Sequence, residues 1–515
     1  MKTVLSIIKC FIISFMFISS VSANDIVVTT IRDDDPPLLD DKCSLREAIE
    51  AANTNSAVDS CAAGTGAGSD QITFFVATPS EIKLVDELDP ITDSLIIRGL
   101  GSNNLSIDGD NSSRHFEFSG GPNFTYVLEH ITLKNGRDTS GGSLLVGVGN
   151  VVTIDNVVFD SNVATNGGGA IRVDNALTGQ NTLNIRRSTF SNNSSGGPST
   201  AGAVSVGRGS AVDVSESTFI NNSANGSQGG AIAVSGGALA STLTINLSTF
   251  FGNQTSRSGS AITSRADLTT ITNTTIIGNT ANINTDSNIT YRGAVDVAEV
   301  SLKNTIIAGN LDNSSSGKVP NLYVGGNNGL SMITSNGFNL IGTNTTFIAA
   351  NGDVSGLTAG SPNADNDWIG TDAVPIDPSL LAIAMNGGPT ATMAIPDPAV
   401  SISPALDKGE CTGDFNDQRS FGVVSGGIKR AFDVASVAAT PGGGDNCDIG
   451  AFEFGTINLV TDRDFDGVVN SADTCPDHFD PDQELVCELE PESLDDPELC
   501  TPIKSINGNI AVVCI

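Results

Sequence analysis

The sequence predicts an all-β fold, a right-handed parallel β-helix, and three observations indicate it. A tandem repeat runs from about Tyr126 to Asn310 with units of 26 to 31 residues, the range typical of solenoids. Apolar residues within each unit alternate with a period of two, which is typical of strands. Turns rich in Asn, Gly and Ser separate these short segments. A leucine-rich repeat has a similar length, but the block lacks its leucine phrase and its helical periodicity.

Each unit carries one bulky apolar anchor residue. An aliphatic residue stands five positions before every anchor, and Asn stands three positions after all but the first, where Gly136 takes its place. We expect equivalent residues to stack about 4.8 Å apart, so that aromatic anchors form an internal ladder and Asn amides hydrogen-bond along the axis. The anchors are Leu133, Phe159, Phe190, Phe219, Phe250, Ile276 and Ile307, and the Asn residues are Asn162, Asn193, Asn222, Asn253, Asn279 and Asn310.

The chain is expected to bend between the anchor and the aliphatic residue before it. These two positions have opposite parity, and polar pairs such as Arg187-Ser188 and Glu216-Ser217 lie between them. A second phrase of alternating small and aliphatic residues follows, as at 170–173 and 203–206. One unit is therefore two or three short strands separated by turns. Earlier coils are expected at 71–76, 81–85, 95–98, 105–108 and 115–118, and a degenerate one at 337–342.

Two short patterns in the repeat resemble a known family. Phe-x-x-Asn recurs at the aromatic anchors, as at 159–162, and Gly-Gly-Ala-Ile occurs at 168–171 and 229–232. The pair resembles the repeats of the polymorphic outer-membrane proteins, which are bacterial surface β-helix proteins. The resemblance covers about a third of the chain. It implies a cell-surface protein with an adhesive role.

The start of the chain has the features of a secretory signal over residues 1–23. Lys2 precedes an apolar run, Lys9 lies within it, and small residues stand before Asn24. No other stretch of the sequence is long and apolar enough to span a membrane. The sequence thus predicts an exported protein, secreted or at the cell surface, with no transmembrane segment after signal removal.

Residues 24–70 are expected to form an N-terminal cap with one helix. Ser44 and Glu47 have capping-box spacing. An open β-helix end exposes apolar strands, so a cap is physically required. The string CSLREA at 43–48 resembles the signature of an N-terminal domain of exported bacterial β-helix proteins. The residues that share the expected buried face are Leu45, Ala48, Ile49 and Ala52.

The solenoid is expected over residues 71–380 and a C-terminal cap over 381–455. Four motifs follow one another in the second segment: Asn386–Thr390, Ser403–Gly409, Asp417–Arg419 and Asp448–Glu453. In this order they resemble the choice-of-anchor Q domain that ends many β-helix proteins. The stretch after Arg419 departs from the family's Gly-rich phrase. We interpret Asp417, Arg419 and Glu453 as a buried ion-pair cluster, and a ligand site is the alternative.

Residues 456–515 form an acidic tail with one candidate Ca²⁺ site. Carboxylates at loop positions 1, 3, 5 and 12 and Gly467 at position 6 have the spacing of a calcium loop, where alternate residues point inward. The flanking Cys-Pro and Asp-Pro-Asp resemble a single thrombospondin type 3 repeat. A merely acidic linker is the alternative. The expected ligands are Asp462, Asp464, Asp466 and Asp473 through side-chain oxygens and Val468 through its carbonyl.

Eight cysteines remain after the expected signal, which contains Cys10, so disulfides are expected in an exported protein. Many connectivities are possible for eight cysteines, and only the first two pairs below are isolated from the others. Sequence proximity suggests the pairs Cys43–Cys61, Cys411–Cys447, Cys475–Cys487 and Cys500–Cys514.

Charge and histidine usage exclude some functions. The net charge of −33 argues against a nucleic-acid partner, since phosphates would be repelled. The three histidines stand far apart in the sequence, and no Ser, His and Asp constellation is evident. We therefore expect them to be structural or solvated. They are His115, His130 and His478.

Two classes of function remain. The first is an adhesive or structural surface protein, with surface glycans or proteins of a host or neighbouring cell as partners. The alternative is a secreted carbohydrate-active enzyme, a lyase or hydrolase, because pectin-lyase-like enzymes place charged residues on exposed coils of this fold. A cleft with several carboxylates and a basic residue would favour the enzyme, and a smooth Asn, Ser and Thr surface the binding protein. The candidate charged pairs, interpreted as exposed surface ion pairs, are Arg172 with Asp174 and Arg292 with Asp296.

Overall fold

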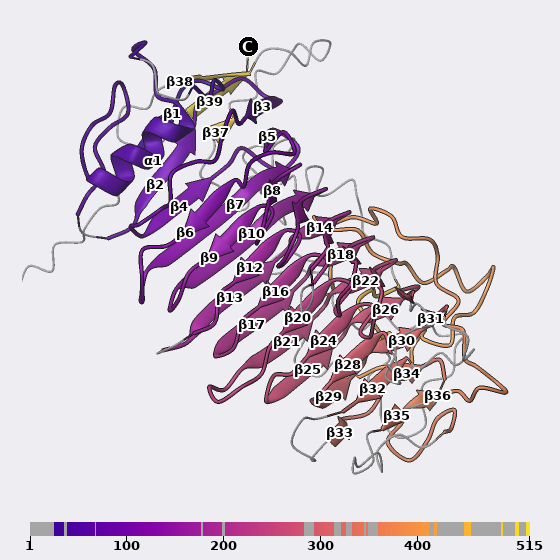
Figure 1. The fold of residues 1–515 in the computed structure, drawn as a ribbon. Coiled ribbons are helices and arrows are strands. Elements are labelled where there is room, and N and C mark those ends of the chain that lie inside the picture. The colour runs from indigo at the N-terminus through magenta and orange to yellow at the C-terminus, as the bar shows by residue number, and fades with distance from the viewer. Residues whose placement is uncertain are drawn as a thin grey trace, which may run out of the picture.

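The computed structural model is an all-β parallel β-solenoid of about 9 turns with 3% helix, as the sequence predicted (Figure 1). The expected signal and calcium loop lie outside the described residues. The described residues are 25–34, 39–66, 68–176, 179–197, 201–282, 293–313, 321–325, 332–343, 347–348, 359–410, 417–419 and 447–454, with the backbone of three short tail strands.

Each full coil contributes strands to four parallel rows, which we call the first row, the anchor row, the short row and the third row, in chain order. The first row is β1 (Asp25–Val28), β2 (Asp70–Phe74), β4 (Leu95–Arg98), β7 (Thr125–Lys134), β10 (Val151–Asp160), β13 (Asn181–Arg186), β17 (Ser210–Ser215), β21 (Thr242–Asn246), β25 (Leu268–Thr272), β29 (Glu299–Lys303) and β33 (Met332–Ser335).

The anchor row begins with β3 (Ser80–Lys83) and β5 (Leu105–Asp108) and continues through the second halves of β7 and β10. Its later strands are β14 (Thr189–Ser191), β18 (Thr218–Ile220), β22 (Thr249–Phe251), β26 (Thr275–Ile277), β30 (Ile306–Ala308), β34 (Leu340–Ile341) and β36 (Trp368–Ile369).

The other two rows close each coil. The short row is β8 (Arg137–Asp138), β11 (Val163–Ala164), β15 (Ser194–Ser195), β19 (Ser223–Ala224), β23 (Gln254–Thr255), β27 (Thr280–Ala281) and β31 (Leu311–Asp312). The third row is β6 (Phe116–Phe118), β9 (Leu144–Val146), β12 (Ile171–Val173), β16 (Val204–Val206), β20 (Ile232–Val234), β24 (Ile262–Ser264), β28 (Val295–Val297), β32 (Leu322–Val324) and β35 (Phe347–Ile348). Every pairing within these rows is parallel, so like residues meet in register.

The predicted bend between the first row and the anchor row is present in every repeat coil. The residue three positions before each anchor has a left-handed backbone with φ between 46° and 56°. The next residue is a buried Ser or Thr in five of these coils, and its hydroxyl donates to the carbonyl two residues earlier, as from Ser217 to Ser215 at 2.7 Å. The same oxygen accepts the Ser188 N–H of the previous coil. The hydroxyl therefore stabilises the bend and the stacking together.

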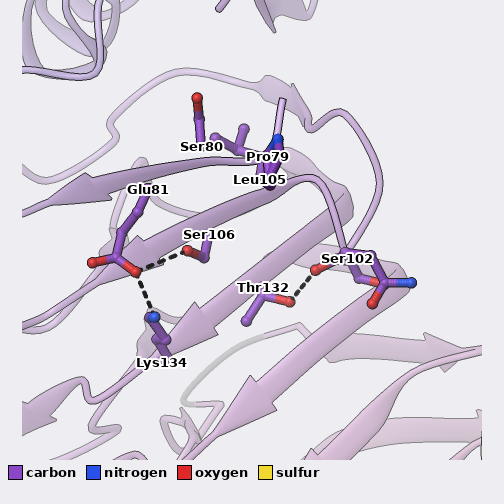
Figure 2. Close-up of a pocket in the computed structure, with 9 residues that line it drawn as sticks. Pro79, Ser80, Glu81, Ser102, Leu105, Ser106, Thr132 and Lys134 are labelled. Carbon is purple, nitrogen blue, oxygen red and sulfur yellow. Dashed lines mark hydrogen bonds and ion pairs between the residues drawn. The ribbon is translucent and has the colours of Figure 1, made fainter. Parts of the chain in front are cut away.

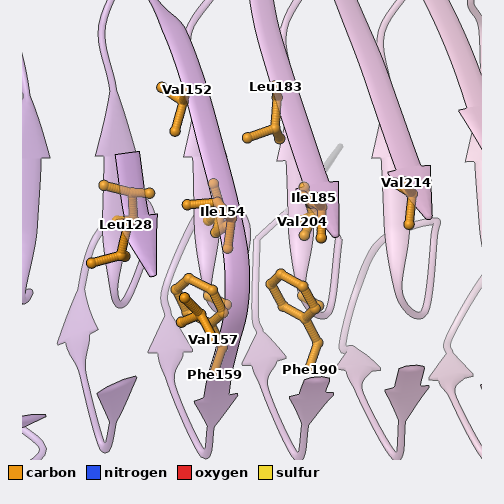
Figure 3. Packing of buried hydrophobic residues seen from close by; sticks show 14 of the residues in the cluster. Leu128, Val152, Ile154, Val157, Phe159, Leu183, Ile185, Phe190, Val204 and Val214 are labelled. Carbon is orange, nitrogen blue, oxygen red and sulfur yellow. The ribbon is translucent and has the colours of Figure 1, made fainter. Parts of the chain in front are cut away.

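The aromatic ladder is confirmed. The rings of Phe159, Phe190, Phe219 and Phe250 are fully buried, and successive ring centroids are 4.7 Å apart with nearly parallel planes. Figure 3 shows Phe159 and Phe190 stacked below the aliphatic column of Leu128, Ile154 and Ile185. Offset or parallel contact between rings adds to the burial of their apolar surface. This core runs the length of the repeat.

The Asn ladder is confirmed as well. Each amide lies inside the turn after its anchor and is at most 2% exposed. Asn222 is typical: its Nδ2 donates to Phe190 O and to Asn253 Oδ1, both at 2.9 Å. Its Oδ1 accepts from the backbone N–H of Asn193 at 3.1 Å. The amides thus satisfy buried backbone groups that the turn would leave unpaired.

A buried histidine begins this ladder. His115 is fully buried, and its Nε2 lies 3.0 Å from Ile107 O and 3.1 Å from Lys134 O. Because both partners are carbonyl oxygens, Nε2 carries the proton and donates. A Cβ on Gly136 would stand 2.7 Å from the His115 ring, so the glycine leaves room for the imidazole. Burial lowers the pKa of His115 to about 4, and the residue is structural, as expected.

The predicted cap helix is α1 (Leu45–Thr54), whose capping box between Ser44 and Glu47 is present. The expected apolar face is buried against β1 and β2 at one end of the stack (Figure 1). Arg46, which the sequence did not single out, is 5% exposed and pairs with both oxygens of Asp33 at 2.9 Å. The strand β1 pairs with β2, so the segment before the helix already belongs to the stack.

The described part of 381–455 lies along the flank of the solenoid and touches coils far from its last turn. In Figure 1 this orange segment runs beside β18, β22 and β26. Thr390 bonds Glu216 O at 3.0 Å, and Asp448 O accepts from Asn304 at 3.0 Å. The three predicted residues are buried, and Arg419 Nη2 forms an ion pair with Asp417 Oδ2 at 2.6 Å. Glu453 meets Arg419 through its backbone carbonyl, also at 2.6 Å, while its carboxylate accepts from the Asp448 N–H at 2.9 Å.

Candidate functional site

The outward side of the first row carries the most regular polar surface of the described residues. Inward Leu, Val and Ile side chains alternate along each strand with outward polar ones, because successive strand residues point to opposite faces. Parallel register then places the outward residues in straight columns. The central column, which we call the polar column, is Thr153, Asn184, Asp213, Thr244, Thr270, Ser301 and Thr334 on successive coils.

All seven side chains of the polar column are half-buried or exposed. Columns on either side add further hydroxyls and amides, such as Thr182, Thr242 and Asn246. A shallow depression of about 140 Å³ lies over β13, β17 and β21 and is lined by Asn184, Asp213 and Thr244 among others. The surface therefore offers repeated hydrogen-bonding groups on a flat sheet, with no deep cleft at this depression.

Asp213 is the charged member of the polar column. Partial burial raises the pKa of its carboxyl, and nearby Arg186 opposes that effect. A carboxylate among hydroxyls and amides extends the range of hydrogen bonds that the column can accept. The column thus combines donors and acceptors on consecutive coils.

A cluster of charged side chains lies at the bend beside this face. Asp155, 5% exposed, accepts from Arg187 at 2.8 and 2.7 Å and lies 3.0 Å from Arg186. Arg98 pairs in the same way with Glu129 at 2.6 Å. Carboxylates and basic residues do stand on adjacent coils, but within each ion pair the opposite charges neutralise each other. Their geometry is that of a structural network.

Glu216 occupies the bend of the next coil. Its backbone is left-handed with φ 49°, an uncommon conformation for this residue type. Burial raises the pKa of Glu216 to about 7, and Arg187 opposes that effect. The sequence analysis named Glu216 only as part of a polar bend. Its altered pKa depends on neighbours that the tertiary structure supplies.

The structure places the two ion pairs expected at the surface in different environments. Arg172 and Asp174 are 3.6 Å apart, and both residues are half-buried, so this pair is less exposed than expected. The expectation for Asp296 was wrong: it is fully buried, and its oxygens accept from Arg265 at 2.8 and 3.1 Å. The third-row strand β28 turns this residue toward a partner in the previous coil. Arg292 lies outside the described residues.

One predicted disulfide is present. Cys43 and Cys61 are bonded and buried beside the cap helix. Cys447 is also disulfide-bonded, but Cys411 lies outside the described residues, so their pairing stays a prediction. In the tail, β38 (Cys500–Ile503) and β39 (Ala511–Cys514) place Cys500 opposite Cys514, while β37 (Val486–Cys487) joins the same sheet. The other tail cysteine, Cys475, lies outside the described residues.

The calcium ligands predicted at 462–473 also lie outside the described residues, as does His478. Within the described ranges, no group of three or more His, Cys, Asp or Glu side chains is arranged to hold a metal ion. The part of the chain that the structure describes holds no helix with the length and apolar character that a membrane crossing requires.

Comparison with known proteins gives one finding. The family model of the Chlamydia polymorphic membrane protein repeat matches residues 156–174. That stretch begins at the bend residue Asn156, contains Phe159 and Asn162 of the two ladders, and ends just after β12. No curated protein and no solved structure matches the chain.

The matched repeat and the solenoid define the class of this protein. It is a parallel β-solenoid with a repeat of the kind found in polymorphic membrane proteins. Such a repeat suggests a surface or outer-membrane protein, and the fold is consistent with an exported structural or adhesive role.

Proposed function

We propose that this protein is an exported surface β-helix that binds an extended glycan along its polar column. The observation that supports the proposal is the unbroken column of hydroxyl, amide and carboxyl groups on seven successive coils. A linear polymer laid parallel to the solenoid axis meets the same groups again at each coil. Many weak hydrogen bonds then add up without a deep pocket.

A polar, hydrated ligand suits this face better than an apolar one. Each contact exchanges hydrogen bonds with water for hydrogen bonds with the ligand, so each contributes little and repetition supplies the affinity. The shallow depression lined by Asn184, Asp213 and Thr244 is open enough to admit one unit of such a polymer. A lyase or hydrolase is the weaker candidate, because the strongest charged groups nearby, Asp155 with Arg186 and Arg187, bind each other.

A glycan array tests the proposal with the full chain. The double substitution Asn184→Ala and Thr244→Ala should weaken retention about thirtyfold if each side chain contributes about 1 kcal/mol. Gln254→Ala is the matched control, since Gln254 is an exposed amide on the short row. Unchanged retention of the double variant, or an equal loss in the control, would contradict the proposal.

We also propose that the acidic tail binds one Ca²⁺ and stiffens a stalk between the solenoid and its attachment point. The support is the spacing of carboxylates from Asp462 to Asp473 around Gly467. A bound ion would gather carboxylates that otherwise repel one another. Extracellular modules of this kind bind with dissociation constants of roughly 10⁻⁴ to 10⁻³ M.

Isothermal titration of the full chain with calcium tests this second proposal. Wild type should give saturable heat at millimolar calcium, and the double substitution Asp464→Ala with Asp466→Ala should abolish it. Asp495→Ala with Asp496→Ala, which removes two charges of the same tail outside the loop and its flanking motif, serves as the control. Identical heats for wild type and the loop variant would leave only an acidic linker.

A further inference from the structure

One outward column of the anchor row is covered at one end of the solenoid and open at the other. The column consists of the residue just before each anchor, and we call it the flank column. Its covered part lies on coils from β18 onward, where the described residues 387–410, 417–419 and 447–454 pack against it. The covered residues are Thr218, Thr249, Thr275, Ile306, Leu340 and Trp368.

The contacts at the covered part show how this column holds a polypeptide segment of turns and bends. Thr218 Oγ1 donates to the Ala391 carbonyl at 2.6 Å, and the Ala451 N–H donates to Thr275 Oγ1 at 3.0 Å. The threonines are at most 2% exposed. Hydroxyls can both donate and accept, so one column of threonines can pair with either backbone group.

Gln418 is the central contact between the covering segment and the flank column. Its side chain is fully buried and lies between threonines of neighbouring coils. Its Nε2 donates to Thr218 Oγ1 at 2.8 Å, and its Oε1 accepts from Thr249 Oγ1 at 2.6 Å. An amide that bridges two hydroxyls one coil apart is therefore the side chain that this column selects in the molecule itself.

The same column continues uncovered toward the N-terminal coils. The residues there are half-buried, and Glu81 is exposed, whereas the covered threonines are buried. The register is unbroken from β18 through β14, β10 and β7 to β5 and β3. The open residues are Thr189, Val158, Thr132, Ser106 and Glu81.

A depression of about 290 Å³ lies over this open part. Ser106 and Thr132 line it and are register partners one coil apart, like Thr218 and Thr249. Figure 2 shows them between Glu81 and Lys134 on one side and Ser102 on the other. Thr132 donates to Ser102 O at 2.6 Å, which leaves its oxygen lone pairs to accept from a ligand.

We propose that the open part of the flank column is the docking site of a turn of a partner protein, with a glutamine side chain inserted between Ser106 and Thr132. Continuity with the covered part carries this inference, because the same column already binds a turn with a buried Gln. A neutral amide fits the charges present. Glu81 and Lys134 pair at 2.5 Å, and a charged side chain would have to break that pair.

This site is separate from the polar column. It faces outward from the anchor row, while the proposed glycan site faces outward from the first row across the bend. Binding at one can therefore be measured without the other. The partner would occupy the part of the flank column that the chain's own segment leaves open.

Fluorescence polarisation with the full chain tests the site. The probe is a labelled peptide of the sequence 414–421, which contains the Gln418 motif. Saturable binding is expected, with about a tenfold loss when Gln in the peptide is replaced by Leu, the effect of one lost amide contact. Ser106→Trp, which fills the depression, should abolish binding, and Thr132→Val should weaken it without adding bulk.

Thr182→Trp is the control, because it fills the other depression, over β13 and β17, and should leave peptide binding unchanged. The proposal is overturned if the Leu peptide binds equally or Ser106→Trp still binds. It is also overturned if no saturation occurs up to millimolar peptide. If light scattering finds a dimer of wild type that Ser106→Trp dissociates, the occupant is a second copy and the partner assignment is wrong.

Discussion

The aromatic ladder gives the most demanding test of the fold. Phe219 is fully buried, with Phe190 and Phe250 each stacked at 4.7 Å on its two sides. Phe219→Ala removes the ring from a core that cannot collapse around it, since both neighbouring rings are fixed by their own strands. Substitutions of this kind cost about 3–5 kcal/mol. Phe219→Asp should be worse still, because a buried unpaired carboxylate is added.

Amide hydrogen exchange is the suitable measurement, because a solenoid loses stability mainly between neighbouring coils. In Phe219→Ala, the free energy of local opening measured by exchange should fall by about 3–5 kcal/mol in β14, β18 and β22. It should fall far less in the cap helix. Asp213→Ala, on the outward side of the same coil, is the control and should change stability by less than about 0.5 kcal/mol. Equal effects of Phe219→Asp and Asp213→Ala, or a uniform loss along the chain, would refute the ladder.

Three further outcomes follow from the same contacts. Asn222→Ala should cost about 3 kcal/mol, since it leaves buried backbone groups of two coils unpaired, and denaturant unfolding measures it against Ser223→Ala. The Glu216 pKa is raised from 4.5 to about 7, so the folded state binds more protons and stability falls as pH rises through that range. Glu216→Gln should therefore match wild type at pH 4 and be more stable at pH 8, and a pH-independent difference would contradict this. In non-reducing buffer, replacing Cys61 by Ser should lower the free energy of unfolding by about 3 kcal/mol. In reducing buffer, the variant and wild type should be equally stable.

Part of the candidate surface follows from the sequence and part does not. The sequence analysis named an Asn, Ser and Thr surface as the sign of a binding protein, and alternation says which residues of one strand share a face. Counting from the anchors also gives the register, because Asn184, Asp213 and Thr244 each stand six positions before an anchor, and the structure pairs them. The sequence does not say which outward columns the chain itself covers, because Thr218 and Gln418 are 200 residues apart.

Ion pairs and pKa shifts that depend on neighbouring coils could not be read from the sequence. The alternation of Asp296 with apolar neighbours indicated a surface residue. It is buried instead, because Arg265 of the previous coil supplies a partner. The altered pKa of Glu216 likewise depends on burial and on Arg187 one coil away. Such effects fall off within a few ångströms, so they require the relative position of residues that are distant in the chain.

The sequence by itself determined the repeat, the strand period, both ladders and the cap helix, since each rests on spacing within one or two units. His115 as the first member of the Asn ladder, the segment along the flank and the pairing of Asp155 with Arg187 were decided by the tertiary structure. The physical reason is that local periodicity specifies how one coil is built, while stacking and long-range docking choose among many arrangements of equal local quality.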